Sequence, residues 1–318
     1  MRLDDAAELE FHDSLPSTNE RALEWAREGA PPFSVVVARE QTAGRGRQGR
    51  SWRSPLDGGL WISIILPTPR RGASGAVPIL VGVSVARAVE EVSGARPFLK
   101  WPNDLLLSTR SGPGGWRKVG GILCQTGLGR RPDRIVAGVG VNLRTPPVDP
   151  PETAGPSTSA ASEAERGMKE RQGPAPIGLD EACDRPVSRE ALAQALLAEL
   201  RRVADPPPAI LSETVLREWA RRDLLLGRDV RVERTGRGRA RGIDSDGALR
   251  LEKPDGTIAA ILSGGVRIIG EGSSALFTGG SSAGGDDRRG EVEAGGTGTR
   301  TGSHTQDGAA AAIRKGDV

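Results

Sequence analysis

The stretch Gln41-Thr42-Ala43-Gly44-Arg45-Gly46-Arg47-Gln48-Gly49-Arg50-Ser51-Trp52 decides how this chain is organised. Its three glycines and three arginines interleave directly after an apolar, strand-like run at residues 33–38. Glycine lets the backbone approach a ligand closely, and arginine offers a planar fork of donors for phosphate or carboxylate. The sequence therefore predicts a cationic loop that wraps an anion, with Trp52 as a surface for a stacked base. The alternative is a solvated loop, since the stretch lacks the Gly-Lys-Ser/Thr ending of a Walker A motif.

A second stretch, Phe98-Leu99-Lys100-Trp101-Pro102-Asn103-Asp104-Leu105-Leu106-Leu107, favours the anion site. Lys100 lies inside an apolar run and is followed at once by a rigid Trp-Pro turn. Removing a lysine charge from water is costly unless a partner compensates for it. The lysine is therefore expected to point from a strand edge toward an anion, although a solvated lysine on an alternating strand remains the alternative.

These two stretches together resemble the signature of the biotin protein ligases, also called biotin–[acetyl-CoA-carboxylase] ligases. Three more segments resemble the family in the same order along the chain: Ser17-Thr18-Asn19, Lys118-Val119-Gly120-Gly121-Ile122-Leu123 and Gly138-Val139-Gly140-Val141-Asn142-Leu143. Each segment alone is a weak signal, whereas five segments in sequence order are specific. The resemblance extends over residues 10–270.

The resemblance implies both a fold and a reaction. The fold is α+β: a mixed β-sheet with packed helices, as in class II synthetases, followed by a small SH3-like β-barrel. The reaction joins biotin to ATP as biotinyl-5′-AMP and then transfers biotin to a lysine of a biotin carboxyl carrier protein. Mg²⁺ is expected to arrive with ATP, held mostly by phosphates and water, so no metal-binding residue is predicted.

The resemblance also implies site residues. Arg47 and Lys100 would act in catalysis, by bridging the biotin carboxylate and the α-phosphate. The predicted biotin-binding residues are these two with Ser17, Thr18, Asn19, Gln41, Arg45, Gly46, Gly120 and Gly121. The predicted ATP-binding residues are Arg50, Trp52 and Asn142.

Two of these positions also have a purely structural interpretation. Ser17 followed by Glu20 fits a capping box, in which the serine side chain caps a helix and needs no ligand. Asn142 fits a turn residue at the end of a strand. Neither interpretation excludes a ligand, since a helix start also offers free backbone N–H groups.

Composition limits the other functions. The 318 residues carry a formal net charge of only +3, which argues against a nucleic-acid-binding protein. Cys124, Cys183, His12 and His304 match no zinc or disulfide pattern. No signal peptide or membrane-spanning run is visible, so a cytoplasmic protein without membrane contact is expected. Because Ser17 lies so early, a ligase without the N-terminal DNA-binding domain of many relatives is expected, and the family includes both monomers and homodimers.

Three regions are predicted along the chain. Residues 1–204 form the catalytic domain, with a low-order insertion at about 145–186, and residues 211–270 form the barrel. Residues 271–318, rich in Gly, Ser, Thr and Ala, form a disordered tail. Within the barrel, Gly236-Arg237-Gly238-Arg239 is predicted as a hairpin turn with solvated arginines, in preference to a second anion site.

Two other functions stay open at this stage. A lipoate or octanoate ligase or transferase would share the fold without this arginine loop. A nonenzymatic nucleic-acid-binding module would use the Arg/Gly segments, but the near-neutral charge, four phenylalanines and absent tyrosines argue against it.

Overall fold

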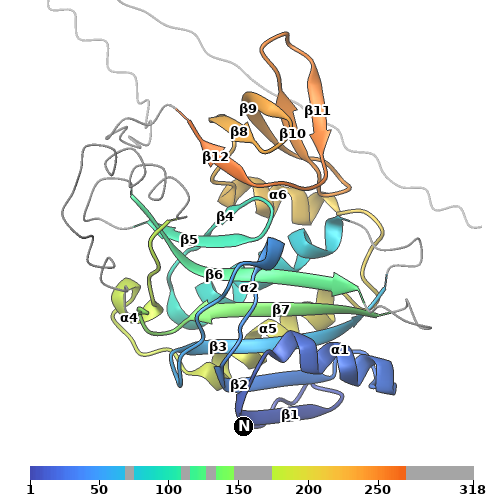
Figure 1. Ribbon diagram of the computed structural model, residues 1–318, viewed down its shortest axis with the longest axis vertical. Coiled ribbons are helices and arrows are strands. Elements are labelled where there is room, and N and C mark those ends of the chain that lie inside the picture. The colour runs from blue at the N-terminus through green and yellow to red at the C-terminus, as the bar shows by residue number, and fades with distance from the viewer. Residues whose placement is uncertain (69–74, 109–114, 127–133, 147–173, 270–318) are drawn as a thin grey trace, which may run out of the picture. The chain divides into compact units, whose positions relative to one another are not determined.

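The strands on both sides of the arginine loop join into one seven-stranded sheet in the order β1-β2-β3-β7-β6-β5-β4 (Figure 1). The computed structural model describes residues 1–68, 75–108, 115–126, 134–146 and 174–269. β1 runs parallel to β2 and every other pair is antiparallel, so the predicted mixed sheet is confirmed. The strands are β1 (Leu9–Leu15), β2 (Val35–Gln41), β3 (Gly59–Pro67), β4 (Phe98–Lys100), β5 (Asp104–Ser108), β6 (Trp116–Thr126) and β7 (Arg134–Asn142).

Helices cover both faces of this sheet because its strands are apolar on both sides. In β2, Val35 and Val37 join the large core on the face of α2 (Ala76–Ser93) and α5 (Arg189–Val203). Val36 points the other way and packs with residues of α1 (Thr18–Glu28). The α1 face is covered only in part, and the uncovered part is where a ligand can reach the sheet. No helix among the described residues has the length and apolarity to span a membrane.

The serines that precede α1 and α5 differ in their side-chain contacts. The Ser188 side chain accepts a hydrogen bond from Ala191 N and caps α5. The capping box at Ser17 is wrong, because its side chain makes no cap hydrogen bond. Tertiary contacts occupy the first turn of α1 instead: Thr18 N donates to Gln41 Oε1 at 2.9 Å, and Glu20 pairs with Arg45 at 2.6 Å.

The predicted insertion at 145–186 is partly wrong. Residues 147–173 lie outside the described residues, as does the predicted tail. Its last part is ordered, since Ile177 and Leu179 are buried and α4 (Leu179–Ala182) follows. Ile177 N donates to Lys118 O and Lys118 N donates to Ala175 O, which attaches this segment to β6. Two apolar side chains in a polar stretch are enough to anchor it.

The region predicted as a small β-barrel forms a second, antiparallel sheet of five strands in the order β11-β10-β9-β8-β12. They are β8 (Asp229–Val232), β9 (Gly236–Ile243), β10 (Leu249–Glu252), β11 (Ile258–Ile261) and β12 (Val266–Ile268). The predicted turn at 236–239 is wrong, because these residues begin β9. The turn lies just before, where Arg234 has φ +65° and Gly236 has φ +104°. Such positive φ angles favour glycine and mark the turn. The turn therefore lies earlier in the chain than the Gly/Arg pattern suggested.

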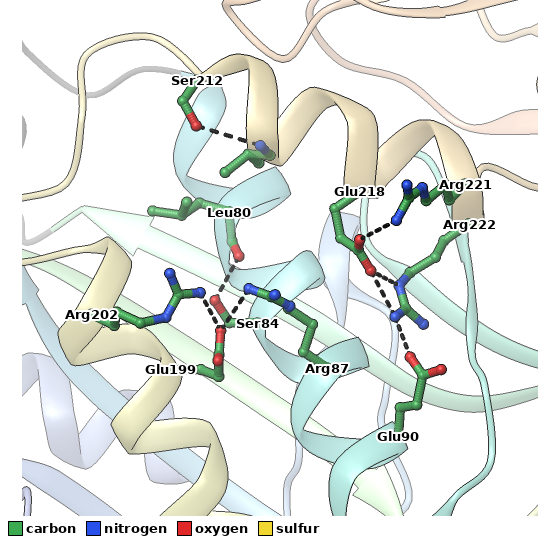
Figure 2. A network of polar contacts seen from close by, with 11 residues as sticks. Leu80, Ser84, Arg87, Glu90, Glu199, Arg202, Ser212, Glu218, Arg221 and Arg222 are labelled. Carbon is green, nitrogen blue, oxygen red and sulfur yellow. Dashed lines mark hydrogen bonds and ion pairs between the residues drawn. The ribbon is translucent and has the colours of Figure 1, made fainter.

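Helix α6 (Glu213–Arg222) is joined to α2 through a buried charge (Figure 2). The Arg222 side chain is only 4% exposed and pairs with Glu218 at 2.7 Å and with Glu90 of α2. Burial is the largest single effect on the Glu218 carboxyl and raises its pKa, but the hydrogen bond from Arg222 and the charges of Arg222, Arg87 and Arg221 together outweigh burial and leave that pKa below its usual value. Removing one partner would leave a buried charge uncompensated, so this pairing fixes α6 against α2.

Asp223 follows directly and is the least satisfied carboxylate of this connection. Its Oδ1 accepts from Leu225 N at 2.8 Å, whereas Oδ2 is buried with no hydrogen-bond partner in the described part of the chain. Burial raises the pKa of Asp223 to about 6. The backbone of Asp223 also forms an isolated β-bridge with Leu99, the residue before Lys100. Protonation of the Asp223 side chain therefore changes the charge beside the second motif.

We expect Asp223 to make the protein more stable in acid than at neutral pH. Its pKa is raised in the folded state, so its stabilising contribution is complete below the unfolded value and is lost as pH rises through about 6. Urea unfolding of Asp223→Asn at pH 7.5 should give a free energy about 2–3 kcal/mol above wild type, with the gap closing near pH 4. Asp246→Asn, in an exposed turn, serves as the control. A gap that does not depend on pH would contradict this assignment.

Candidate active site

A cleft of about 860 Å³ lies over the uncovered part of the α1 face, and both sequence motifs contribute to it. This volume suits a small organic ligand together with a nucleotide. Eleven of the thirteen predicted site residues line it: Ser17, Thr18, Asn19, Gln41, Arg45, Gly46, Arg47, Arg50, Trp52, Lys100 and Gly121. Residues far apart in sequence therefore meet where the prediction required.

Strand β7 forms the floor of the cleft because two of its residues that face the cleft are glycines. Ile135, Ala137 and Val139 point into the large core, so the residues between them point to the cleft face. There a Cβ on Gly138 would lie 2.0 Å from Asn19 Oδ1, and a Cβ on Gly140 would lie 2.6 Å from Trp52 Nε1. Both glycines are required by close approach, since any side chain would displace a cleft residue.

A hydrogen-bond network closes one end of the cleft. Gln41 Oε1 accepts from Thr18 N and Oγ1, and Gln41 Nε2 donates to Ser54 Oγ at 2.7 Å. The Ser63 hydroxyl lies 2.8 Å from Thr18 Oγ1 and 2.6 Å from Asn19 Oδ1. The protein itself therefore fixes these side chains before any ligand binds.

Ser63 was not predicted as a site residue. Its only signal in the sequence is a single hydroxyl within the apolar strand β3, on the side opposite to Ile62 and Ile64. Asn19 is also held more firmly than expected, since its Nδ2 donates to Leu123 O and Gln125 Oε1. The protein therefore engages both Nδ2 and Oδ1 of the Asn19 amide.

The arginine loop has a defined hairpin form. Trp52 N donates to Gly44 O at 2.8 Å, and Gly46 N donates to Arg50 O at 2.7 Å. A Cβ on Gly44 would lie 2.4 Å from Trp52 O, so only glycine allows the two sides to close. The hairpin turns the arginine side chains over the cleft.

Two cations from the two motifs share the cleft. Arg47 donates to Asn103 Oδ1 at 3.2 Å, and burial lowers its pKa. Burial also lowers the pKa of Lys100. The negative charge of Asp104 raises that pKa, whereas the positive charges of Lys118, Arg267 and Arg50 lower it. Within the described part of the chain, neither Arg47 nor Lys100 has an ion-pair partner, so both are available to an anionic ligand.

Lys118 is a cleft residue whose role was not predicted, although it begins one of the quoted motifs. Its Nζ pairs with Asp104 Oδ1 at 2.6 Å and lies 5.2 Å from the centre of the Trp52 ring. The pairing of β5 with β6 shifts its register nearby, between Leu105 and Leu106. The lysine holds the carboxylate and the indole in one place.

Two predicted residues do not line the cleft. A Cβ on Gly120 would meet Gly140 O at 2.8 Å and Leu105 Cβ, so this glycine serves strand packing, whereas Gly121 faces Trp52 and Lys118. The Asn142 side chain is buried and donates to Ile177 O at 3.2 Å. The ordered segment after residue 174, which was expected to be of low order, covers it.

A cationic cleft beside a closed polar pocket, on a mixed sheet, suits an enzyme that binds an anionic substrate. The biotin/lipoate A/B protein ligase family model matches residues 11–142, and the biotin protein ligase C-terminal domain model matches residues 225–266. The bifunctional ligase/repressor BirA of Bacillus subtilis is 31% identical over 255 residues, covering 78% of this chain and 70% of that relative. The biotin–[acetyl-CoA-carboxylase] ligase of Paracoccus denitrificans is 30% identical over 249 residues, covering 76% of this chain and 92% of that relative.

Among solved structures, the biotin protein ligase of Aquifex aeolicus in complex with biotin and ATP matches with a TM-score of 0.61 and 25% identity. The match covers 82% of this chain and 99% of that one. The chain therefore belongs to the biotin protein ligases, ATP-dependent enzymes that act on the biotin carboxyl carrier protein of acetyl-CoA carboxylase.

Gly140→Ala should weaken ATP binding by moving Trp52. The added methyl group would lie within 3 Å of the indole, so the ring must leave its place on the cleft wall. In ATP–pyrophosphate exchange we expect KM for ATP to rise about tenfold or more, the cost of losing one stacked base, with a smaller change for biotin. Gly82→Ala in α2, whose new Cβ has 3.4 Å to its nearest neighbour, is the control. An unchanged KM for ATP would contradict this role of Trp52.

Proposed function

We propose that this cleft joins the biotin carboxylate to the α-phosphorus of ATP and then passes biotin to a lysine of a carrier protein. The observation that supports it best is the meeting of Arg47 and Lys100. They come from separate motifs, line one cleft and have no ion-pair partner within the described residues. Partly buried cations without protein anions are suited to an anionic substrate.

In the first step an oxygen of the biotin carboxylate bonds to the α-phosphorus, and the bond from that phosphorus to the bridging oxygen of pyrophosphate breaks. The main obstacle is repulsion between a carboxylate and a polyanion. Arg47 and Lys100 would lie between the two groups and stabilise charge on the non-bridging oxygens. Each charge-assisted hydrogen bond contributes about 1.5–3 kcal/mol, so two or three account for a large part of the effect. The step requires no side-chain nucleophile.

Biotin would bind at the closed end of the cleft. Its ureido group needs neutral donors and acceptors, which Ser17, Thr18 and Gln41 offer. Gly121, on the cleft wall beside Trp52, leaves room for the flat fused rings. The Arg45 backbone would contribute donors, and Gly46 would let the loop close over the ligand.

ATP would occupy the more cationic side of the cleft. Trp52 would stack on the adenine, and Arg50 would hold the departing pyrophosphate. Asn142 lies under Ile177, so it would affect adenine binding only by supporting the wall of the cleft.

Mg²⁺ would enter as part of the Mg–ATP substrate. Within the described residues no group of three or more His, Cys, Asp or Glu side chains is placed to hold a metal. The carboxylates on the cleft are Asp104, which is paired with Lys118, and Glu233. This fits a magnesium ion coordinated mainly by phosphates and water.

In the second step the amine of the carrier lysine attacks the acyl carbon of the adenylate. The amide bond forms, the bond to AMP breaks, and the lysine nitrogen loses a proton. The cations that stabilised the first step would also stabilise the departing phosphate of AMP.

Biotin-dependent ATP–pyrophosphate exchange tests the first step. We expect exchange in wild type with biotin and none with lipoate, which separates this function from that of a lipoate ligase. Arg47→Ala and Lys100→Ala should each lower the rate about a hundredfold or more, the usual loss for one group that stabilises transition-state charge. Arg250→Ala and Lys253→Ala, on the second sheet away from the cleft, are the charge-matched controls. Exchange that survives in both cleft variants would overturn the proposed roles.

The pH dependence of exchange tests Lys100 by itself. Burial lowers its pKa, so the ammonium form is lost at a pH below the ordinary range of lysine. The activity that needs this charge should fall as pH rises through the lowered pKa, and kcat/KM should show the fall since it reports free enzyme. Lys100→Arg keeps its charge and should lose this alkaline limb. The same limb in wild type and variant would exclude Lys100 as its source.

A further inference from the structure

Ser63 is a buried residue of β3 whose two polar neighbours in α1 line the cleft. Its hydroxyl oxygen lies 2.6 Å from Asn19 Oδ1 and 2.8 Å from Thr18 Oγ1. Ser63 itself is fully buried and does not line the cleft, whereas Thr18 and Asn19 do. It can therefore act on a ligand only through these two side chains.

The sheet places Ser63 in one row with two other residues under α1. Ser63 is directly opposite Gly138 of β7, which in turn is directly opposite Leu123 of β6. A Cβ on Gly138 would lie 2.0 Å from Asn19 Oδ1, so the Asn19 amide rests directly on this glycine. The hydroxyl of Ser63 and the carbonyl oxygen of Leu123 are therefore both within reach of that amide.

The neighbours of Asn19 fix the direction of its amide. Nδ2 carries two hydrogens and donates to Leu123 O at 3.1 Å and to Gln125 Oε1 at 2.8 Å. The reverse orientation would set the amide oxygen against the carbonyl oxygen of Leu123. Oδ1 therefore faces Ser63, and since Oδ1 carries no hydrogen, the single hydrogen of the Ser63 hydroxyl belongs to this bond. Any other use of that hydrogen would leave a buried amide oxygen without a donor, which folded proteins avoid.

The Thr18 hydroxyl is left with an acceptor on each side. Gln41 Oε1 accepts from Thr18 N at 2.9 Å while Gln41 Nε2 donates to Ser54 Oγ, so the oxygen of this amide faces Thr18. Thr18 Oγ1 lies 3.1 Å from Gln41 Oε1 and 2.8 Å from Ser63 Oγ, whose own hydrogen is already used. The single hydrogen of Thr18 therefore stays inside the protein whichever of the two accepts it. Only the lone pairs of Thr18 Oγ1 remain for a ligand.

We propose that Ser63 is a positioning residue that keeps the Thr18 hydroxyl a hydrogen-bond acceptor, so that the site selects a ligand with an N–H group at this point. This inference rests on the proposed function, in which the ureido group of biotin lies at the closed end of the cleft. That group carries two N–H donors. A ring of the same shape with oxygen in place of N–H would bring a lone pair against the lone pairs of Thr18. Ser63 thus acts on the polarity of the accepted ring, not on its shape.

Two cyclic carbamate analogues of biotin test this polarity in the wild-type protein. In each of them an oxygen atom replaces one of the two ureido N–H groups, and the carboxylate chain is unchanged. In ATP–pyrophosphate exchange we expect kcat/KM for one of the two to lie about tenfold or more below that for biotin, because a site built for an N–H rejects the analogue that lacks it. Wild type that uses both analogues within about twofold of biotin would overturn the proposal. Absent exchange with biotin itself would overturn the proposed function instead.

Ser63→Ala tests the positioning role. Without the Ser63 oxygen, the Thr18 hydrogen loses one of its two acceptors in the protein and can turn toward an oxygen of the ligand. The preference for biotin over the rejected analogue, as a ratio of kcat/KM values, should therefore fall about tenfold. The preference for biotin over desthiobiotin, which lacks the sulfur but keeps both N–H groups, should stay within about twofold. A merely structural loss would lower kcat/KM for all three compounds alike, and two unchanged ratios would overturn the role of Ser63.

Two further variants complete this test. Ser84→Ala removes another buried hydroxyl, which donates to Leu80 O at 3.0 Å within α2 (Figure 2), and should change neither ratio. Ser63→Cys keeps the size of the side chain but offers a weaker donor and acceptor, so its preference for biotin over the rejected analogue should lie between those of wild type and Ser63→Ala. Since Ser63→Cys disturbs packing least, it decides the question if Ser63→Ala does not fold. A wild-type ratio in Ser63→Cys would then overturn the role of Ser63.

Discussion

The alternation of side chains along β7 is the constraint on which the rest of the structure depends. One set of residues fills the core under α2, so the intervening positions decide what the cleft contains. With Gly138 and Gly140 at two of them, the helix start at Asn19 and the indole of Trp52 rest directly on the sheet backbone. The two glycines leave space above the sheet. Only this space lets the arginine loop and α1 approach the sheet so closely.

Placing several positive charges in this cleft lowers the stability of the folded protein, and the surrounding residues offset this loss only in part. Lys118 is neutralised by Asp104 at 2.6 Å, but Lys100 and Arg47 lose hydration without gaining an anion, and their lowered pKa values express that loss. Active sites commonly retain such destabilising arrangements because the ligand compensates them.

The second sheet is bound to the strand that carries Lys100. Leu224 N donates to Leu99 O, and Trp101 Nε1 donates to the carbonyl oxygen of Gly247 at 3.0 Å. These bonds lie on both sides of Lys100, and Arg222 secures the helix that precedes them. The lysine is therefore placed jointly by both sheets, which explains why residues 264–268 of the second sheet line the cleft.

The sequence by itself determined the strands, the long helices and the residues that meet in the cleft. Apolar periodicity is a local property of the sequence, and five motifs in family order specify one active site. Arg47 and Lys100 belong to separate motifs and were therefore predicted to meet in one site. Only the tertiary structure decided the contacts that depend on register. The Ser17 cap gave way to a contact with Gln41, Gly120 and Gly121 were separated by the pleat, and Asn142 was covered by Ile177. Each of these outcomes depends on which residue of another strand lies opposite, and that pairing is set by the packing of the whole chain.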